Sequence, residues 1–447
     1  MDLFSVLFNQ TSLKKCFSMK THNCWNLAFE YVKGLVTNPD KCNLTSISDN
    51  CSDKNNQAFS HFLSQSPWDT RTLLNWIRDS GWRLIGKNGA LVIDECGNPK
   101  AGTKSVGVKR QYCGNIGKVE NSQVGVYLAY VKNGARLLID YRLYLPKSWC
   151  SDPEKCKSSG VPQSEQTFRT KGELALEMIV DAIRAGHRFT HVCMDGFYGS
   201  QPWLLTKLEQ MKVTYVGDIQ SVSRVYVTKP EYSIPPRKGN RGRDPSRKVV
   251  LNTHAVRVDE IIKNITHWKT IKIRESTEGF LIVKFTAVKV WRIDNQISRP
   301  LPVWLLIRKE LDDSEVKYSF CNAIGIQSWD RLAKMQSDRY WIERSFQDAI
   351  ALAGMADYQV RNWNAWHHHM SLVLLAMLWI TKEQHTMLED IQEITIQDVV
   401  RVIKLILPVK VQTALTVART ILRNHRNRRD SRKSKMNRKM RLNQCSS

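Results

Sequence analysis

The pattern of apolar and polar positions changes along the chain and predicts where helices and strands lie. Apolar residues recur at helical spacing over residues 73–85, and Ser66 followed by Pro67 predicts the start of that helix. The short apolar run ALVIDE, residues 90–95, instead predicts a buried strand that ends in two carboxylates. The chain therefore changes from an all-helical N-terminal region to one that contains strands.

Two more strands and a helix follow that first strand. Residues 122–131 and 135–146 are β-rich, and the Lys-Asn-Gly between them predicts a hairpin turn. A helix is expected over residues 170–186, where Thr170 and Glu173 form a capping box and Gly186 ends the helix. These elements predict three consecutive strands and then a helix.

The next stretch continues with strand, helix and strand. FTHVCMDG predicts a buried strand ending at Asp195, QPWLLTKLEQM a helix and VTYVGDI another strand. The predicted order is three strands, a helix, a strand, a helix and a strand. This is the order of an RNase H-like domain, in which the first and fourth strands are neighbours. Asp94 and Asp195 would then meet at one edge of the sheet.

A polar, basic segment after Asp218 and several β-rich runs interrupt this pattern before helix returns near Trp329. The predicted fold class is α/β: an RNase H-like mixed sheet with an inserted mostly-β subdomain, flanked by N- and C-terminal helical regions. Three divisions are expected in the first part of the chain: a helical DNA-binding region at 1–85, the first part of the core at 86–220 and the inserted β subdomain at 221–320. The core helix that carries Glu343 follows at 321–355, then a C-terminal helical region at 356–422 and a basic tail at 423–447.

The net charge of the chain limits the classes of partner that are expected to bind it. Lys and Arg number 67 against 42 Asp and Glu, a net charge of +25, which predicts a polyanionic partner, nucleic acid before an anionic membrane surface. The longest apolar run, residues 370–380, is too short to cross a bilayer, so no membrane partner is expected. Residues 423–441 carry ten Lys and Arg, and this tail, with Arg428 and Arg429, is expected to be disordered in isolation and drawn to phosphates.

The number and spacing of the cysteines indicate the cellular compartment of the protein. The eleven cysteines are odd in number and contain no CxxC pair, so a disulfide framework is not expected. The predicted location is the bacterial cytoplasm, in association with DNA.

Three carboxylates carry the predicted chemistry. Phosphodiester cleavage can use two divalent metals about 4 Å apart, held by carboxylates from separate elements, and Mg²⁺ prefers such oxygen ligands. Asp94 and Asp195 at neighbouring strand ends, with Glu343 on a helix crossing the sheet, would form this set. Arg339 and Arg344 would contact the phosphate backbone, or form local salt bridges instead.

Three segments resemble DDE-class insertion-sequence transposases of the branch that has a β-strand insertion between the second Asp and the Glu. The segments are LVIDECGNPKAGTKSVGVKRQYCGNIGKVENSQVGVYLAY, MDGFYGSQPWL and RYWIERSFQDAIALAGMADYQVRNWNAWHHHM. The resemblance implies that Asp94, Asp195 and Glu343 are catalytic metal ligands for two Mg²⁺ ions, with Mn²⁺ as a substitute. It also implies cleavage at transposon ends, transfer into target DNA, and a homodimer on DNA.

The signature around the Glu is matched only in part. Arg339 and Glu343 match, whereas Gln336 stands at the Tyr position and Ile350 at the Lys position. A catalytically weakened or inactive protein that still binds transposon ends is therefore the alternative. A nuclease for branched or hybrid nucleic acid is a weaker third reading.

Other candidate residues have a structural interpretation beside the functional one. Glu95 is the alternative ligand to Asp94, Asp195 could simply cap a helix, and Tyr198 either packs or touches DNA. Consecutive histidines at 367–369 point in different directions on a helix, so they cannot chelate one ion. The GxxGK-like stretch before residue 119 lacks P-loop spacing, so no nucleotide cofactor is expected, and its cations are predicted to line a DNA track: Lys104, Lys109, Arg110 and Lys118.

Overall fold

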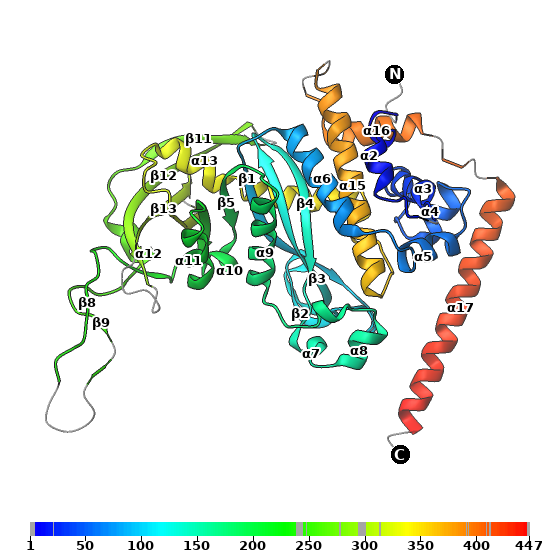
Figure 1. The fold of residues 1–447 in the computed structure, drawn as a ribbon, viewed down its shortest axis with the longest axis horizontal. Coiled ribbons are helices and arrows are strands. Elements are labelled where there is room, and N and C mark those ends of the chain that lie inside the picture. The colour runs from blue at the N-terminus through cyan, green and yellow to red at the C-terminus, as the bar shows by residue number, and fades with distance from the viewer. Residues whose placement is uncertain are drawn as a thin grey trace.

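The computed structural model shows an elongated molecule with a strand-rich end, a central sheet and a helical end (Figure 1). The inserted strands lie at one end, and the N-terminal helices together with the last helices of the chain lie at the other. The residues that the structure describes are 5–20, 22–237, 245–246, 248–276, 279–293, 301–312, 314–389, 391, 393–407, 409–410 and 413–444.

The centre of the sheet has the predicted RNase H-like order. Strands run β4-β3-β1-β5-β6, with β1 parallel to β5, β5 parallel to β6, and β3 antiparallel to both of its neighbours. The bounds are β1 (Gly89–Pro99), β3 (Lys118–Lys132), β4 (Ala135–Leu143), β5 (Phe189–Met194) and β6 (Tyr215–Ile219). The α/β class and the pairing of the first strand with β5 are confirmed.

The first strand is longer than predicted. It does not end at Asp94 but continues to Pro99, because β3 goes on pairing with it as far as Ser122. An additional strand, β2 (Lys109–Cys113), pairs with β3, and two short helices, α7 (Lys147–Cys150) and α8 (Pro153–Ser158), precede the predicted helix. The stretch expected to be a loop between strands is therefore partly sheet.

Local signals for turns and caps are confirmed. Asn133 and Gly134 both have positive φ, 49° and 85°, as a two-residue hairpin turn between twisted strands requires. Thr170 and Glu173 form the predicted capping box at the start of α9 (Lys171–Arg184). By contrast, α6 (Thr70–Ile85) begins after Asp69 and not at Pro67, since the Asp69 carboxylate accepts from two backbone N–H groups of the first turn.

The inserted strands continue the sheet of the core. β14 (Val316–Cys321) pairs antiparallel with β6, β13 (Pro302–Glu310) with β14, and β12 (Gly279–Arg292) with β13. In the described residues the result is one 12-stranded sheet that runs through the core and the insertion. The remaining strands of the insertion are β7 (Arg224–Tyr226), β8 (Tyr232–Ser233), β9 (Val249–Val250), β10 (Val256–Arg257) and β11 (Lys269–Ser276), with α12 (Val258–Ile261) between β10 and β11.

Helices cover both faces of the sheet. One face carries α13 (Trp329–Ser337) and α14 (Tyr340–Leu352), which pack against strands of the insertion and of the core. The other face carries α9, the short α10 (Gly196–Gly199) and α11 (Pro202–Gln210). Since successive residues of β1 point to opposite faces, each face receives different side chains from that strand.

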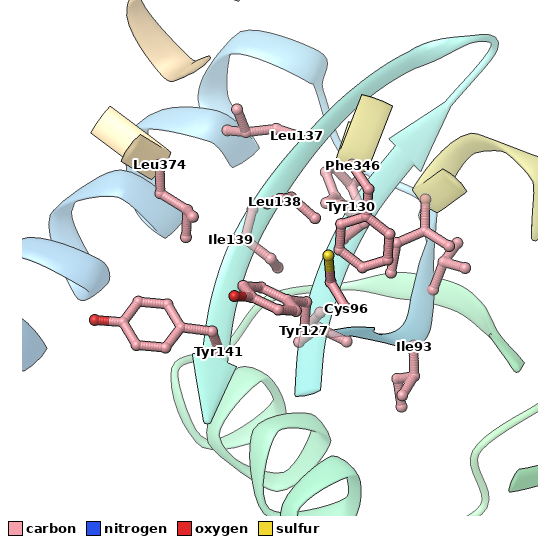
Figure 2. Packing of buried hydrophobic residues seen from close by; sticks show 14 of the residues in the cluster. Ile93, Cys96, Tyr127, Tyr130, Leu137, Leu138, Ile139, Tyr141, Phe346 and Leu374 are labelled. Carbon is pink, nitrogen blue, oxygen red and sulfur yellow. The ribbon is translucent and has the colours of Figure 1, made fainter. Parts of the chain in front are cut away.

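One apolar core joins the helical end to the sheet. Figure 2 shows Phe346 of α14 near Tyr127, with the ring centroids 5.3 Å apart, and Leu374 of α15 (Trp363–Met387) near β4. The N-terminal helices pack around α15: α1 (Ser5–Phe8), α2 (Thr11–Lys15), α3 (Trp25–Thr37), α4 (Leu44–Asn50), α5 (Asn56–Ser64) and α6, with α16 (Ile396–Ile406) beside them.

The three consecutive histidines are structural. His368 stacks on Trp68 at 4.0 Å between ring centroids, and both of its ring nitrogens face backbone carbonyl oxygens. His369 shares a hydrogen bond of 2.8 Å with the hydroxyl of Tyr31 on α3. His367 bonds to the carbonyl oxygen of Trp363, one turn earlier. The three rings hold different neighbours, as their spacing on a helix predicts.

The basic tail is helical. α17 (Ala414–Gln444) extends from the body as one long helix, so over residues 423–444 the tail is helical where disorder was expected (Figure 1). Lys and Arg are good helix formers, and their charge does not prevent a helix in which the side chains remain in solvent. Within the described residues, no helix is both long enough and apolar enough to cross a bilayer.

Candidate active site

The sheet brings Asp94 and Asp195 together. Ile93 of β1 is in register with Met194, the last residue of β5, so Asp94 and Asp195 follow paired residues. Asp195 also caps α10, because its carboxylate accepts from the backbone N–H groups of Phe197 and Tyr198 at 3.0 and 3.2 Å. β5 ends here while β1 continues, so Asp94 has no strand neighbour on the β5 side of β1.

Asp94 and Asp195 are both half-buried, and Arg339 is a cation close to them. Burial and the nearby charge of Asp195 raise the pKa of Asp94 to about 8, against a smaller opposing effect of Arg339. Burial also raises the pKa of Asp195. The side chain of Asp94 is only 15% exposed. A carboxyl group whose proton affinity is raised by burial and by a neighbouring carboxylate also favours a cation that can bind there.

Arg339 links Glu343 to the strand acids. Its guanidinium bonds to the Glu343 carboxylate at 2.7 Å, one helical turn away, and lies 3.7 Å from an oxygen of Asp94. Burial tends to lower the pKa of Arg339, but the charges of Glu343, Asp218 and Asp94 outweigh burial and raise it. Asp94 and Glu343, 249 residues apart in the printed sequence, thus converge on one guanidinium.

The residues suit a hard divalent cation by their chemistry, although their present arrangement does not hold one. Within the described residues, no three His, Cys, Asp or Glu side chains are placed so that they could hold a metal ion. Carboxylate oxygens are the ligands that Mg²⁺ prefers, and burial together with the charge of Asp195 raises the pKa of Asp94 despite the opposing charge of Arg339. Glu343 would have to exchange Arg339 for the metal.

Asp218 is a fourth acid that the sequence analysis did not assign. It lies on β6, accepts from the Nε of Arg339 at 3.0 Å and from the hydroxyl of Ser319 at 2.6 Å. The amide of buried Gln336 in turn donates to the Ser319 hydroxyl at 2.8 Å. The sequence signal for Asp218 was its place near the end of the predicted strand VTYVGDI, because β6 is the parallel neighbour of β5.

The two departures from the family signature are both accommodated. Gln336 completes a chain of hydrogen bonds from α13 through Ser319 and Asp218 to Arg339. Ile350 is half-buried, packs against the core and lines a small cavity whose lining includes Tyr127 and the amide side chains of Asn98, Asn115 and Gln123.

Glu95 faces away from Arg339. Its carboxylate pairs with Lys171 of α9 and accepts from the hydroxyl of Tyr198 at 2.9 Å. Tyr198 is 0% exposed, so the expectation that it touches DNA is wrong, and the packed alternative is correct. Glu95 and Tyr198 instead secure α10, and with it Asp195, against the sheet.

Gly199 of the DGFYG motif allows α10 to approach β6 closely. A Cβ atom at this position would overlap the carbonyl oxygen of Asp218 and lie 2.7 Å from the carbonyl carbon of Gly217. Because that neighbour is backbone, it cannot move aside as a flexible side chain would. The absence of a side chain at 199 therefore keeps Asp195 and Asp218 in neighbouring positions.

The remaining candidates for DNA contact lie at the surface. Arg344 is partly exposed and donates to Gln347 of its own helix at 2.7 Å. Arg428 and Arg429 are exposed on α17. The exposed cations near β2 and the start of β3 are Lys104, Lys109, Arg110 and Lys118. All of these remain predictions of DNA binding.

Comparison with known proteins gives the family. The DDE superfamily endonuclease family matches residues 12–279, which include Asp94 and Asp195 but not Glu343. The probable transposase for insertion sequence element IS701 from Microchaete diplosiphon is 30% identical over 197 residues, 43% of this chain and 49% of that protein. The matched segment thus spans about half the length of this relative.

A solved structure is also similar in part. The cryo-EM structure of a piggyBac transposase synaptic complex with hairpin DNA matches with a TM-score of 0.39 and 12% identity, over 91% of this chain and 70% of that one. The family match, by contrast, covers more than half of the chain. The chain therefore belongs to the DDE superfamily of endonucleases.

Proposed function

We propose that this protein is a DNA transposase that cleaves phosphodiester bonds at transposon ends and joins the freed strand to target DNA. The observation that carries the proposal is the convergence of Asp94 and Glu343 on Arg339, beside Asp195. A basic protein of net charge +25 also suits a polyanionic substrate.

Asp94, Asp195 and Glu343 would hold the divalent ions, two Mg²⁺ or in their place Mn²⁺. When bound, such ions activate the attacking oxygen and stabilise the leaving one. Asp218, which pairs with the Nε of Arg339 at 3.0 Å, would keep that guanidinium at the site if Glu343 and Asp94 bound the metal. Arg339 would then bind the phosphate that is being cut, because its planar fork suits phosphate oxygens.

The partners in this proposal are transposon-end DNA and target DNA. The N-terminal helices, residues 1–85, would recognise the end sequence, and the basic helix α17 would add affinity that does not depend on sequence. A homodimer on DNA would bring the two ends together.

A cleavage assay tests the proposal. The substrate is a labelled duplex from the DNA that flanks the coding sequence, incubated with Mg²⁺ or Mn²⁺. The unmodified protein should cut it, and Asp94→Asn, Asp195→Asn and Glu343→Gln should bind it equally well but fail to cut. Glu260→Gln, which removes an exposed carboxylate on α12, is the matched control and should cut normally.

The outcomes separate the alternatives. Binding without cutting by the unmodified protein would favour the inactive end-binding protein over the transposase. Normal cutting by Glu343→Gln would remove that residue from the proposed triad and leave the two strand acids, which lie within the family match.

A further inference from the structure

A basic pocket lies beyond the far end of β1, outside the candidate active site. It has a volume of about 440 Å³ and is lined by Thr103, Lys104, Trp149, Lys155, Ser158, Ser159, Arg361 and Asn362. Three of these residues are cations and none is an acid. The lining comes from three segments far apart in the sequence: the loop after β1, the helices α7 and α8, and the start of α15.

Backbone hydrogen bonds hold these three segments together. The N–H of Val106, in the loop of Lys104, donates to the carbonyl oxygen of Arg361 at 2.8 Å. The N–H of Trp363 donates to the carbonyl oxygen of Ser159 at 2.9 Å. The cations of the pocket therefore sit on a connected backbone and do not depend on independent loops.

The side chain of Lys155 also packs against the ring of Trp149. Its ammonium lies 4.0 Å from the centre of the Trp149 ring, and the indole N–H of Trp149 donates to the carbonyl oxygen of Val108 at 2.8 Å. Of the two acids close by in sequence, Asp152 uses its carboxylate to cap α8, where it accepts from the backbone N–H of Lys155, and the exposed Glu154 is not among the residues that line the pocket. The ammonium itself is left facing the pocket.

Charge in the pocket is uncompensated. Within the described residues, no carboxylate lies within ion-pair distance of Lys104, Lys155 or Arg361, although most buried or half-buried arginines of the protein have one. Like charges on a connected scaffold repel one another, so this cost is offset when an anion binds. The hydroxyl group of Thr103 adds a donor that suits phosphate oxygens, whereas the hydroxyl of Ser158 donates to the carbonyl oxygen of Lys155 at 3.0 Å.

The pocket follows the end of β1 that lies beyond Asp94 in the chain. β1 continues from Asp94 to Pro99 and Lys100 still bonds to the β3 partner strand at Asn121, so the pocket begins roughly 20 Å from Asp94 at ~3.3 Å per residue. One DNA strand has a phosphate about every 3.4 Å of helix axis. That separation corresponds to about six nucleotides.

We propose that this pocket binds the phosphate backbone of duplex DNA about six nucleotides from the bond that is cut. Lys104, Lys155 and Arg361 contact the phosphates, and the pocket thus fixes the direction in which the duplex leaves the active site. The inference rests on the proposed function and specifies where the substrate binds.

The test measures binding without cleavage. Affinity for a 5′-labelled duplex of arbitrary sequence is measured in EDTA over a range of salt concentrations, so no metal or end sequence is needed. The triple variant Lys104→Ala, Lys155→Ala, Arg361→Ala should lower the slope of log affinity against log salt by about 2 to 3, at ~0.9 per phosphate contact. At moderate salt, we expect a loss of roughly tenfold to hundredfold in affinity.

The matched control removes the same charge elsewhere. Lys87, Arg184 and Arg188 are exposed cations near the opposite ends of β1 and β5, and their triple alanine variant should keep the original slope. Lys104→Glu alone is a second variant at a fully exposed position, where folding is not at risk, and it should also weaken binding.

Equal slopes for the pocket variant and the unmodified protein would overturn the inference while leaving the transposase proposal intact. An equal loss in both triple variants would also overturn it, because the effect would then be one of net charge. If the unmodified protein binds no duplex at all, the proposed function itself fails.

Discussion

Replacing Asp94 by Asn should stabilise the metal-free protein while it removes a proposed metal ligand. Burial and the charge of Asp195 raise the pKa of this carboxyl from 3.8 to about 8. The folded state therefore binds the proton more tightly than the unfolded state, and the free energy of unfolding falls as pH rises from about 4 to 8. Asn keeps the shape of the side chain and does not ionise.

The magnitude follows from that shift. Between pH 3.8 and pH 7 the destabilisation accumulates at about 1.4 kcal/mol per pH unit, which gives an upper limit of roughly 4 kcal/mol. Part of this is lost with the contact of Asp94 to Arg339 at 3.7 Å. We therefore expect Asp94→Asn to gain about 2 to 4 kcal/mol at pH 7, on the order of 5 °C in Tm.

Thermal unfolding in EDTA at pH 5 and pH 7 measures the effect. The gain should be larger at pH 7 than at pH 5, and Asp53→Asn, at a fully exposed carboxylate, should change neither value. Adding Mg²⁺ or Mn²⁺ should stabilise the unmodified protein and leave Asp94→Asn unchanged, since binding to the folded state alone raises stability.

A Tm for Asp94→Asn equal to or below that of the unmodified protein at pH 7 without metal would refute the reasoning. It would mean that the charge of Asp94 is already compensated in the folded protein. The carboxyl cluster would then have no unmet need for a cation.

Three other substitutions test separate features of the structure. Gln336→Leu removes the donor to Ser319 and should slow DNA cleavage about tenfold without changing DNA affinity, as a single-turnover assay with a parallel binding titration would show. Gly199→Ala forces a Cβ against backbone and should cost at least about 2 kcal/mol in urea unfolding, whereas Gly325→Ala, which meets no atom within 4 Å, should cost less than about 1 kcal/mol. Burial lowers the pKa of His367 and of His369 to about 3, so the protein should lose up to about 1.4 kcal/mol per histidine for each unit that pH falls between 6.5 and 3, and a double Gln variant should show a flatter stability–pH profile in that window.

Local patterns predicted much of the fold because they depend on near neighbours in the chain. The turn at Asn133 and Gly134 needs only two residues that tolerate positive φ, and the capping box of α9 needs only Thr170 and Glu173. The order of strands and helices then selects the RNase H-like sheet, since connections follow few allowed topologies. That order was enough to place Asp94 beside Asp195.

Side chains whose environment comes from distant segments could not be assigned in the same way. Tyr198 lies in a motif that suggested DNA contact, but its hydroxyl is buried against Glu95, which is 103 residues earlier. The basic residues of 423–444 have a composition typical of disorder, yet they continue a helix. Composition alone does not report whether a charged segment extends an existing helix.

The sequence by itself determined the class of the fold, the strand positions of Asp94 and Asp195 and the helix that carries Glu343, because each depends on local periodicity. Only the tertiary structure decided that the inserted strands extend the same sheet and that Arg339 stands among the acids. The physical reason is strand register. The pairing of β14 with β6 sets Ser319 opposite Asp218, and Asp218 in turn pairs with the guanidinium of Arg339. No local pattern in either strand encodes a pairing across about 100 residues of chain.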